Sequence, residues 1–585
     1  MLAAVIYLQT FKHLPSMQAS QNDTSISSLN EDLLFQIFME NTYEDFNYHF
    51  QDLTHQIWRP RPLTTARHCS QVCRRWRSIF LSSTSIWGRL IHLDDLLQNA
   101  DDWRKEVVAR TGKALLWVYG YLYPSQGPVD FLFALLEGNW RRVQILVITD
   151  HNHHMGDIHY PREKICAFLN QPAPQLQRFN VSLVYMRDAD STSTSHITRL
   201  FGDDAPLIKE FQLRSRRLDG FSDLNASWIT NLTSVTFNIV FDTEEVFKAL
   251  QRMPRLLSMA LDINPKAPDG HLPKVSLPTL RMLELQGDLA IAGTILQSIT
   301  PSLDCCLSFK STDFSHFTYL TRRKSGKFPL GPYRELEGDH EIERTYYRYE
   351  EVVKAYVEPY LYLHPPTVVE LLHTSHDTLM LRNSVSPSQT CRYFRIECHA
   401  PFLRSHSLLK DLIAKPAYFS QVEKLYLTVW LSSFPSGPDI MSTFNVFSSI
   451  TTLCTCDTIL KELLKHAPHI STLFPALVTL EIPNPSITKF VDRIPHHQYL
   501  KLLKAAGRPV AVLDFGRILL MPGFNNNMDY LEEHNGLLVK FWTDVGGAVE
   551  YICGSGHPET LQLCFPEAQI WKSLGWEGDS EAKLR

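Results

Sequence analysis

One spacing pattern constrains the fold of this chain more than any other feature. An apolar residue, two spacers, a second apolar residue, one spacer and a third apolar residue recur in four copies that begin at positions 208, 232, 256 and 280. The copies are Ile208, Phe211, Leu213; Leu232, Val235, Phe237; Leu256, Met259, Leu261; and Leu280, Leu283, Leu285. Alternation at the end of each copy is typical of a strand. Because so short a unit cannot bury its own apolar face, neighbouring units must stack.

Weaker copies flank this core. They are Val143, Leu146, Ile148; Leu176, Phe179, Val181; Cys391, Phe394, Ile396; Val422, Leu425, Leu427; Ile450, Leu453, Thr455; and Leu477, Leu480, Ile482. Helical patterns such as "TEEVFKALQRM" and "DTILKELLKHA" lie between copies. The equal steps fall within the range of leucine-rich repeats. We therefore predict an α/β solenoid over residues 93–565, with a concave strand surface suited to binding a partner.

Two features modify this prediction. The usual Asn or Cys of the inner turn is mostly missing, so we expect an irregular leucine-rich-repeat horseshoe. A charged, Tyr-rich stretch at about 310–366 breaks the rhythm and is predicted to be an insertion, an exposed loop leading into a helix. A substrate-contact loop is the alternative there, because Tyr and Arg dominate interface hot spots. A generic α/β domain remains the alternative to the solenoid as a whole.

A second organised region lies at residues 26–92. Apolar residues recur at helical spacing in Leu29–Phe38, where Ser28 or Asn30 could cap the helix. After a polar insertion at about 41–63, a second apolar stripe runs through Cys69, Val72, Cys73, Trp76, Ile79 and Phe80. Ile86 and Trp87 begin a further short apolar turn. A three-helix packing unit with no partner would satisfy these stripes.

The order of residues here resembles the F-box of fungal F-box proteins. The segments that carry the resemblance are "SLNEDLLFQIF" and "ARHCSQVCRRWRSIFLSSTSIWGRL". Asn30 departs from the pattern, since proline is common there, and the insertion between the two halves is long. The resemblance implies docking to the small acidic Skp-family adaptor of an SCF-type (cullin-RING) ubiquitin ligase, and through it to a cullin. The residues expected at this interface are Leu29, Leu33, Leu34, Ile37, Phe38, Cys69, Val72, Cys73, Trp76, Ile86 and Trp87.

Composition limits the classes of partner. The formal net charge of -5 over 585 residues gives no whole-chain reason to expect nucleic acid. Eleven cysteines, an odd number in so long a chain, fit reduced thiols and a cytoplasmic or nuclear protein. The apolar residues 1–11 lack a basic leader region and are too short to cross a bilayer, so we expect no membrane association. Residues 1–25 and 566–585 are predicted to be weakly ordered tails.

One cluster could carry chemistry. Asp150, His151, His153, His154, Asp157 and His159 lie close together in sequence. They could hold a transition metal, but they show no helical ligand frame, and a polar loop is the preferred interpretation. No phosphate-binding loop, dinucleotide fingerprint or nucleophile elbow appears. We expect no enzyme, cofactor or metal, but a substrate receptor whose repeats bind a target protein. The alternatives are an interaction scaffold without ubiquitin transfer and, less favoured, a metal-dependent enzyme using His151–His159.

Overall fold

The computed structural model describes most of the chain between residues 29 and 563. The described residues are 29–42, 62–96, 101–122, 126–150, 160–183, 186–187, 199–215, 224–237, 242–262, 272–287, 289–311, 340–373, 378–383, 394–399, 412, 415–428, 444–465, 473–483, 493–517, 526–543, 547–557 and 562–563. The chain divides into two compact units: unit 1 is Met1–Glu284 with Ser298–Ser302, and unit 2 is Leu285–Gln297 with Leu303–Arg585. Each unit is a mixed α/β structure, compatible with a repeat solenoid.

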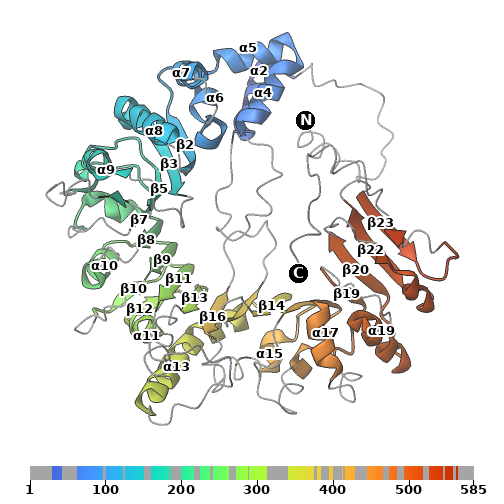
Figure 1. Ribbon diagram of the computed structural model, residues 1–585. Coiled ribbons are helices and arrows are strands. Elements are labelled where there is room, and N and C mark those ends of the chain that lie inside the picture. Colours follow the sequence, from blue (N-terminus) through green and yellow to red (C-terminus); the bar gives the residue numbers. More distant parts are fainter. Residues whose placement is uncertain are drawn as a thin grey trace, which may run out of the picture. The chain divides into compact units, whose positions relative to one another are not determined.

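Unit 1 begins with helices and continues as alternating strands and helices (Figure 1). In chain order its elements are α2 (Glu31–Glu40), α4 (Pro62–Val72), α5 (Arg74–Ser82), α6 (Thr84–Gly88), β1 (Ile91–His92), η3 (Leu93–Leu96), α7 (Asp101–Arg110), β2 (Leu116–Leu122), α8 (Gln126–Asn139), η4 (Trp140–Arg142), β3 (Val143–Asp150), β4 (Tyr160–Pro161), α9 (Arg162–Leu169), β5 (Arg178–Leu183), β6 (Met186–Arg187), η5 (Leu200–Asp203), β7 (Glu210–Ser215), η6 (Ser227–Asn231), β8 (Ser234–Phe237), α10 (Thr243–Leu250), β9 (Ser258–Asp262), β10 (Val275–Leu277), the first half of β11 (Met282–Gly287) and β12 (Ile299–Pro301).

The strands of unit 1 form a parallel sheet in the register that the repeat predicts. Phe211 of β7 lies opposite Val235 of β8, which in turn lies opposite Met259 of β9. All three side chains are buried. Helices α8, α9 and α10 lie along one side of these strands (Figure 1). The triplets therefore supply the core between sheet and helices, and the short period leaves room for a single helix or turn in each return.

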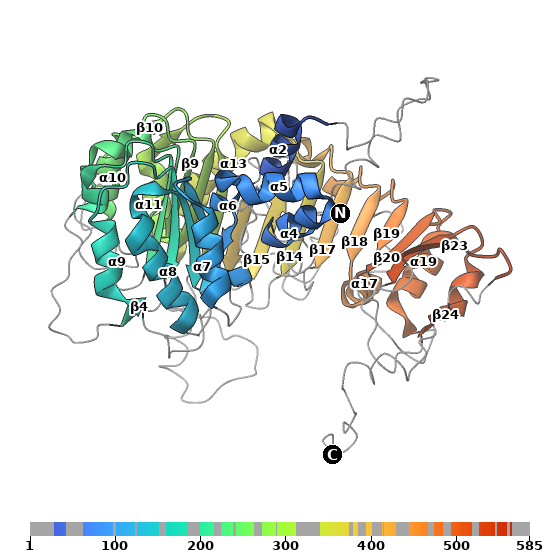
Figure 2. The same cartoon turned by 90° about the horizontal axis from the view of Figure 1, so that it is seen from above.

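Unit 2 contains the second run of strands. Its elements are α11 (Leu289–Ser298), β13 (Cys306–Ser311), α13 (His340–Leu363), β14 (Val368–His373), β15 (Thr378–Asn383), β16 (Arg395–His399), α15 (Pro416–Phe419), β17 (Lys424–Thr428), η9 (Asn445–Phe447), β18 (Thr452–Thr455), α17 (Asp457–Leu464), β19 (Thr479–Glu481), α19 (Pro495–Ala505), β20 (Val512–Arg517), β21 (Asn526–Asn527), η11 (Asp529–Glu533), β22 (Leu538–Thr543), β23 (Gly547–Ile552) and β24 (Gln562–Leu563). Strands β17, β18, β19 and β20 run side by side and parallel (Figure 2).

Two interruptions make the sheet of unit 2 irregular. Strand β15 pairs antiparallel with both β14 and β16, so it breaks the parallel order. At the other end, β23 pairs antiparallel with β22 and closes the series as a hairpin. A hairpin of this kind covers the last parallel strand, whose backbone groups would otherwise stay unpaired.

The predicted insertion contains one long helix. Residues 312–339 lie outside the described residues, and α13 occupies the rest of the stretch up to Leu363. Val353, Val357 and Tyr360 of α13 are buried. The Tyr356 hydroxyl donates to the backbone oxygen of Leu296, at 2.6 Å. The second half of the insertion is thus packed into unit 2. No helix in the described residues is both long enough and apolar enough to cross a membrane.

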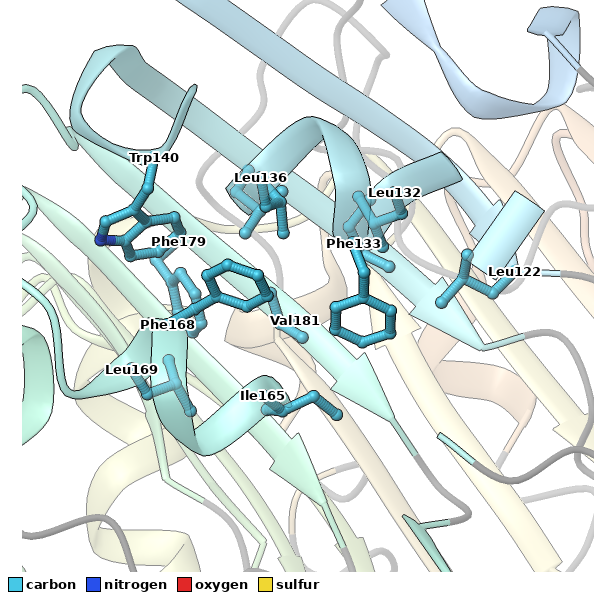
Figure 3. Close-up of a pocket in the computed structure, with 12 residues that line it drawn as sticks. Leu122, Leu132, Phe133, Leu136, Trp140, Ile165, Phe168, Leu169, Phe179 and Val181 are labelled. Carbon is cyan, nitrogen blue, oxygen red and sulfur yellow. The ribbon is translucent and has the colours of Figure 1, made fainter. Parts of the chain in front are cut away.

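Packing beneath α8 and α9 leaves one small void (Figure 3). Its volume is about 40 Å³ and its walls are apolar side chains, including Phe133, Trp140 and Phe168. The ring of Phe168 stacks on that of Phe133 at 5.9 Å. The lining side chains are all apolar or aromatic, so this space presents no charged group that would orient a ligand.

Candidate functional site

Helix α2 is fixed at its start by a local cap. The side chain of Asn30 accepts a hydrogen bond from the backbone N–H of Leu33, at 2.8 Å. Glu31 and Asp32 occupy the first turn, where the helix dipole favours negative charge. The structure thus places at the N-cap Asn30, one of the two residues that the sequence offers as caps.

One face of α2 packs onto α5. The Phe38 ring lies 5.0 Å from the Trp76 ring in an edge-on arrangement and 4.2 Å from the Phe80 ring. Leu34, one turn before Phe38, is fully buried. Positions 34 and 38 lie on one face of a helix because they are four residues apart. Leu33 and Ile37 form the adjacent stripe, and they remain 46% and 41% exposed.

The second apolar stripe is divided into two helices rather than one. Cys73 has extended backbone angles (φ -155, ψ 169) and separates α4 from α5. Its sulfur accepts a hydrogen bond from the backbone N–H of Trp76 at 3.4 Å, so the thiol acts as the N-cap of α5. The Arg77 guanidinium donates to the backbone oxygen of Ser70, which ties α5 to the end of α4. Burial raises the pKa of the Cys69 thiol, which keeps it neutral.

The following helix, α6, connects this region to the sheet of unit 1. The indole N–H of Trp87 donates to the backbone oxygen of Phe80 at 2.6 Å, and the guanidinium of Arg110 lies over the Trp87 ring. Gly88 is so close to the backbone of Leu115 that a Cβ there would lie 2.4 Å from the Leu115 oxygen. Strand β1 then pairs with β2. The four helices α2, α4, α5 and α6, called the helical module below, are therefore continuous with the repeats.

The structure divides the eleven predicted contact residues into two sets. Leu34, Phe38, Ile86 and Trp87 are buried within the chain. The expectation that they touch a partner needs correction, because they form the core of the helical module itself. Leu33, Ile37, Val72 and Cys73 are exposed, and Leu29, Cys69 and Trp76 are half-buried. Sequence periodicity could not separate the sets, since both lie on apolar stripes. Leu81, 45% exposed, is an accessible apolar residue that the sequence reasoning missed.

Positive charge accompanies this accessible apolar surface. Arg67 and Arg74 are exposed on α4 and α5. Arg75 lies 3.9 Å from Glu31 of α2, an exposed pair worth little by itself. A surface that combines large apolar side chains with cations is suited to an apolar partner that carries negative charge.

The strands offer a second candidate surface, which differs between the units. In unit 1, register places Asn180, Gln212 and Thr236 in one row, an uncharged ladder. The corresponding row in unit 2 contains charged and ionisable residues: Glu370, Tyr426, Cys454, Glu481, Asp514 and Lys540. Many of these charges are paired within the chain. For example, Lys424 donates to Glu481 at 2.7 Å, and Arg382 lies 2.6 Å from Glu370.

The predicted cluster of histidines and aspartates at residues 150–159 lies almost entirely outside the described residues. Asp150 ends β3, and residues 151–159 with their four histidines lie outside the described residues. Within the described residues, no group of three or more His, Cys, Asp or Glu side chains is placed to hold a metal ion. A buried cluster that the sequence did not reveal contains Asp457, His496 and Tyr530. Its members are far apart in the chain, and no motif marks them.

Comparison with known proteins adds little. No protein-family model and no curated protein matches this sequence. Among solved structures, one match is the leucine-rich repeat-containing protein LegL7 from Legionella pneumophila, with 12% identity and a TM-score of 0.22. The match covers 66% of this chain and 88% of that protein.

Proposed function

We propose that this chain is a substrate-receptor subunit of an SCF-type (cullin-RING) ubiquitin ligase. In this proposal the helical module is an F-box that docks onto the Skp-family adaptor, and the strand surfaces of the repeats bind a target protein. The residue order from Cys69 to Trp87 and its resemblance to fungal F-boxes support this assignment. Catalysis belongs to other subunits, and this chain contributes proximity by tethering target lysines near the ubiquitin-carrying enzyme.

The observation that carries the proposal is the unburied stripe of α2. A helix whose other apolar face is fully packed still exposes Leu33 and Ile37 to solvent. Val72 and Leu81 are exposed as well. Exposed large apolar residues that gather on one small module indicate an interaction surface, whereas single scattered ones are ordinary.

Simple energetics show what the docking needs. Full burial of a large apolar side chain is worth roughly 1.5–3 kcal/mol, so four half-exposed residues supply about 4 kcal/mol. Loss of rigid-body freedom costs on the order of 4–15 kcal/mol. Burial of these four exposed apolar residues is therefore insufficient by itself. The half-buried Leu29, Cys69 and Trp76, together with the cations Arg67 and Arg74, must add to them if the complex is stable.

A binding experiment with the full-length chain tests the docking. The Leu33→Asp, Ile37→Asp double variant places two charges where the adaptor would bury apolar surface. We expect binding to a purified Skp-family adaptor to weaken at least about 100-fold, which is about 2.8 kcal/mol. Both positions are already exposed, so hydrogen exchange of the repeats should not change. Trp76 is a poorer site for substitution, because its ring packs against Phe38.

A matched control is available on the repeats. Leu207 and Leu257 are 42% and 43% exposed, so the Leu207→Asp, Leu257→Asp double variant introduces the same two charges at similarly exposed leucines outside the module. This variant should bind the adaptor normally. If the Leu33→Asp, Ile37→Asp variant still captured the adaptor at full strength, the docking proposal would be wrong. If the wild type bound the adaptor but no bound target became ubiquitylated in a reconstituted ligase, the interaction scaffold would replace the receptor.

A further inference from the structure

A chain of hydrogen bonds crosses the interior of unit 2. Asp457, the first residue of α17, accepts from the backbone N–H of His496 at 3.1 Å and lies 2.8 Å from the Nδ1 atom of the same residue. The His496 Nε2 atom lies 2.6 Å from the hydroxyl of Tyr530 in η11. The two ring nitrogens of His496 thus each face a polar partner, the Asp457 carboxylate on one side and the Tyr530 hydroxyl on the other. Asp457 and His496 are both 1% exposed or less.

A second pair lies beside the first. The Nδ1 atom of His497 lies 3.2 Å from the Nε2 atom of His534, and both side chains are buried. The Tyr530 ring packs edge-on against His497 at 5.1 Å. One of the two facing nitrogens must donate a proton and the other must accept it. Two fully protonated rings would therefore lose this hydrogen bond and place two positive charges in contact.

The charges around the pair make protonation more difficult. Two lysines of α19 contact Glu533 of η11. The Lys501 ammonium lies 2.9 Å from the Glu533 carboxylate, and the Lys504 ammonium donates to the Glu533 backbone oxygen at 2.9 Å. The Glu533 carboxylate lies 4.0 Å from His497 and partly offsets the lysines. Burial, followed by the nearby His497 and Lys504, lowers the pKa of His534 to about 4.

We propose that these residues form a pH-sensitive latch. Near neutral pH the latch holds α17, α19 and η11 together through the Asp457–His496–Tyr530 chain and the His497–His534 pair. Acidification opens it, because protonation places a positive charge on a buried ring, and protonation of the accepting nitrogen also breaks the hydrogen bond of the pair. The three elements belong to successive repeats that lead to the closing hairpin of β22 and β23. Opening would therefore loosen the C-terminal end of unit 2 and leave unit 1 unchanged, whether or not the chain serves a ubiquitin ligase.

The direction of the effect follows from proton linkage. A solvated histidine has a pKa of about 6.5, whereas His534 in the closed state has a pKa of about 4. The open state thus binds more protons than the closed state below a pH of about 6.5. The closed state therefore loses stability as the pH falls from about 6.5 toward about 4. At about pH 5 a single site with these two pKa values favours opening about 20-fold more than at about pH 7.

Hydrogen exchange of the full-length chain, corrected for intrinsic exchange rates, measures this opening. Between about pH 7 and about pH 5 we expect protection of α19 and η11 to fall by about 20-fold. Peptides from α10 and β7 of unit 1 should keep their protection. His534→Gln removes the titrating ring and should abolish most of the pH dependence. Equal protection of α19 in the wild type at both pH values would overturn the proposal, as would an unchanged 20-fold response in His534→Gln.

Two further variants separate a switch from a purely structural role. Tyr530→Phe removes the hydroxyl next to His496, so it should reduce protection at both pH values while the pH response remains. His364→Gln alters a histidine paired with Asp304 elsewhere in unit 2 and should leave the response intact. If His534→Gln is already open at neutral pH, a second variant without the titrating ring, His534→Asn, decides the question. Loss of the pH response in that variant supports the latch, and its retention overturns it.

Discussion

Helices α2 and α10 have similar N-terminal caps but expose different amounts of apolar surface. Each has an Asx cap, since Asn30 accepts from Leu33 and Asp242 accepts from Glu244 and Glu245. Both carry two acidic residues in the first turn. In α10 the apolar residues Val246, Phe247, Ala249 and Leu250 are all buried. Helix α2 buries Leu34 and Phe38 but leaves Leu33 and Ile37 exposed.

The difference concerns what each helix packs against. The return segment α10 lies along the sheet of unit 1, and its outer face carries Lys248 between Glu244 and Glu245. Helix α2 contacts α5 through one stripe only, and its second stripe faces solvent. Helix α10 has its apolar residues covered by its neighbours in the same chain, whereas α2 has apolar surface that a second protein could cover.

The largest effect should come from the core of the repeats. Phe247→Ala removes a fully buried ring from α10. We expect the free energy of unfolding of unit 1 to fall by about 4 kcal/mol, because the lost burial adds to the cost of a cavity. Urea unfolding measures it, and Lys248→Ala on the exposed face of α10 is the control. A loss below about 1 kcal/mol would show that α10 is not firmly packed.

A somewhat smaller effect is expected for the helical module. Phe38→Ala deletes the ring that packs on Trp76 and Phe80, and we expect a local loss of about 3 kcal/mol. Because α2 packs mainly on α5, hydrogen exchange should increase in α2 and α5 while α10 and β7 remain protected. Equal loss of protection throughout unit 1 would contradict the view that the module and the repeats are separately packed.

The sequence predicted the repeats well because their register is local. The spacing of Phe211, Val235 and Met259 placed three neighbouring strands in the register that the structure has. The strand that breaks the order, β15, was not predicted, because antiparallel pairing with β14 and β16 leaves no periodic signal. The break at Cys73 was missed for a similar reason, since an apolar stripe continues across it.

The division of the contact residues and the buried histidine cluster lay beyond sequence reasoning. Leu33 and Leu34 are adjacent in the chain, and only the position of α5 decides that one is exposed and the other buried. Asp457, His497 and His534 meet only after three repeats have stacked. Burial and long-range contact depend on packing between elements, which spacing along one element does not encode.

Removal of the N-terminal caps tests the feature that α2 and α10 share. Asn30→Ala and Asp242→Ala each remove a side chain that accepts backbone N–H bonds in the first turn. We expect losses of about 1 kcal/mol at each site. The loss in α10 should appear in the urea unfolding of unit 1, and the loss in α2 as faster hydrogen exchange in α2 alone. If neither variant differed from wild type, water would replace the caps equally well.

The smallest effect per substituted apolar residue is the most informative about function. The Leu33→Ser, Ile37→Ser double variant removes two side chains that the chain itself covers only in part. We expect the free energy of unfolding to fall by about 1 kcal/mol per residue, because only about half of each side chain is buried in the folded state. The matched substitution of Val246 and Leu250 in α10, both buried, should cost several times more. Both variants are compared by urea unfolding and by hydrogen exchange of α2 and α10. A large loss for the α2 variant would mean that Leu33 and Ile37 are covered by this chain in solution. The unburied stripe would then be part of the core, and the helical module would have no more surface to offer a partner than the repeats have.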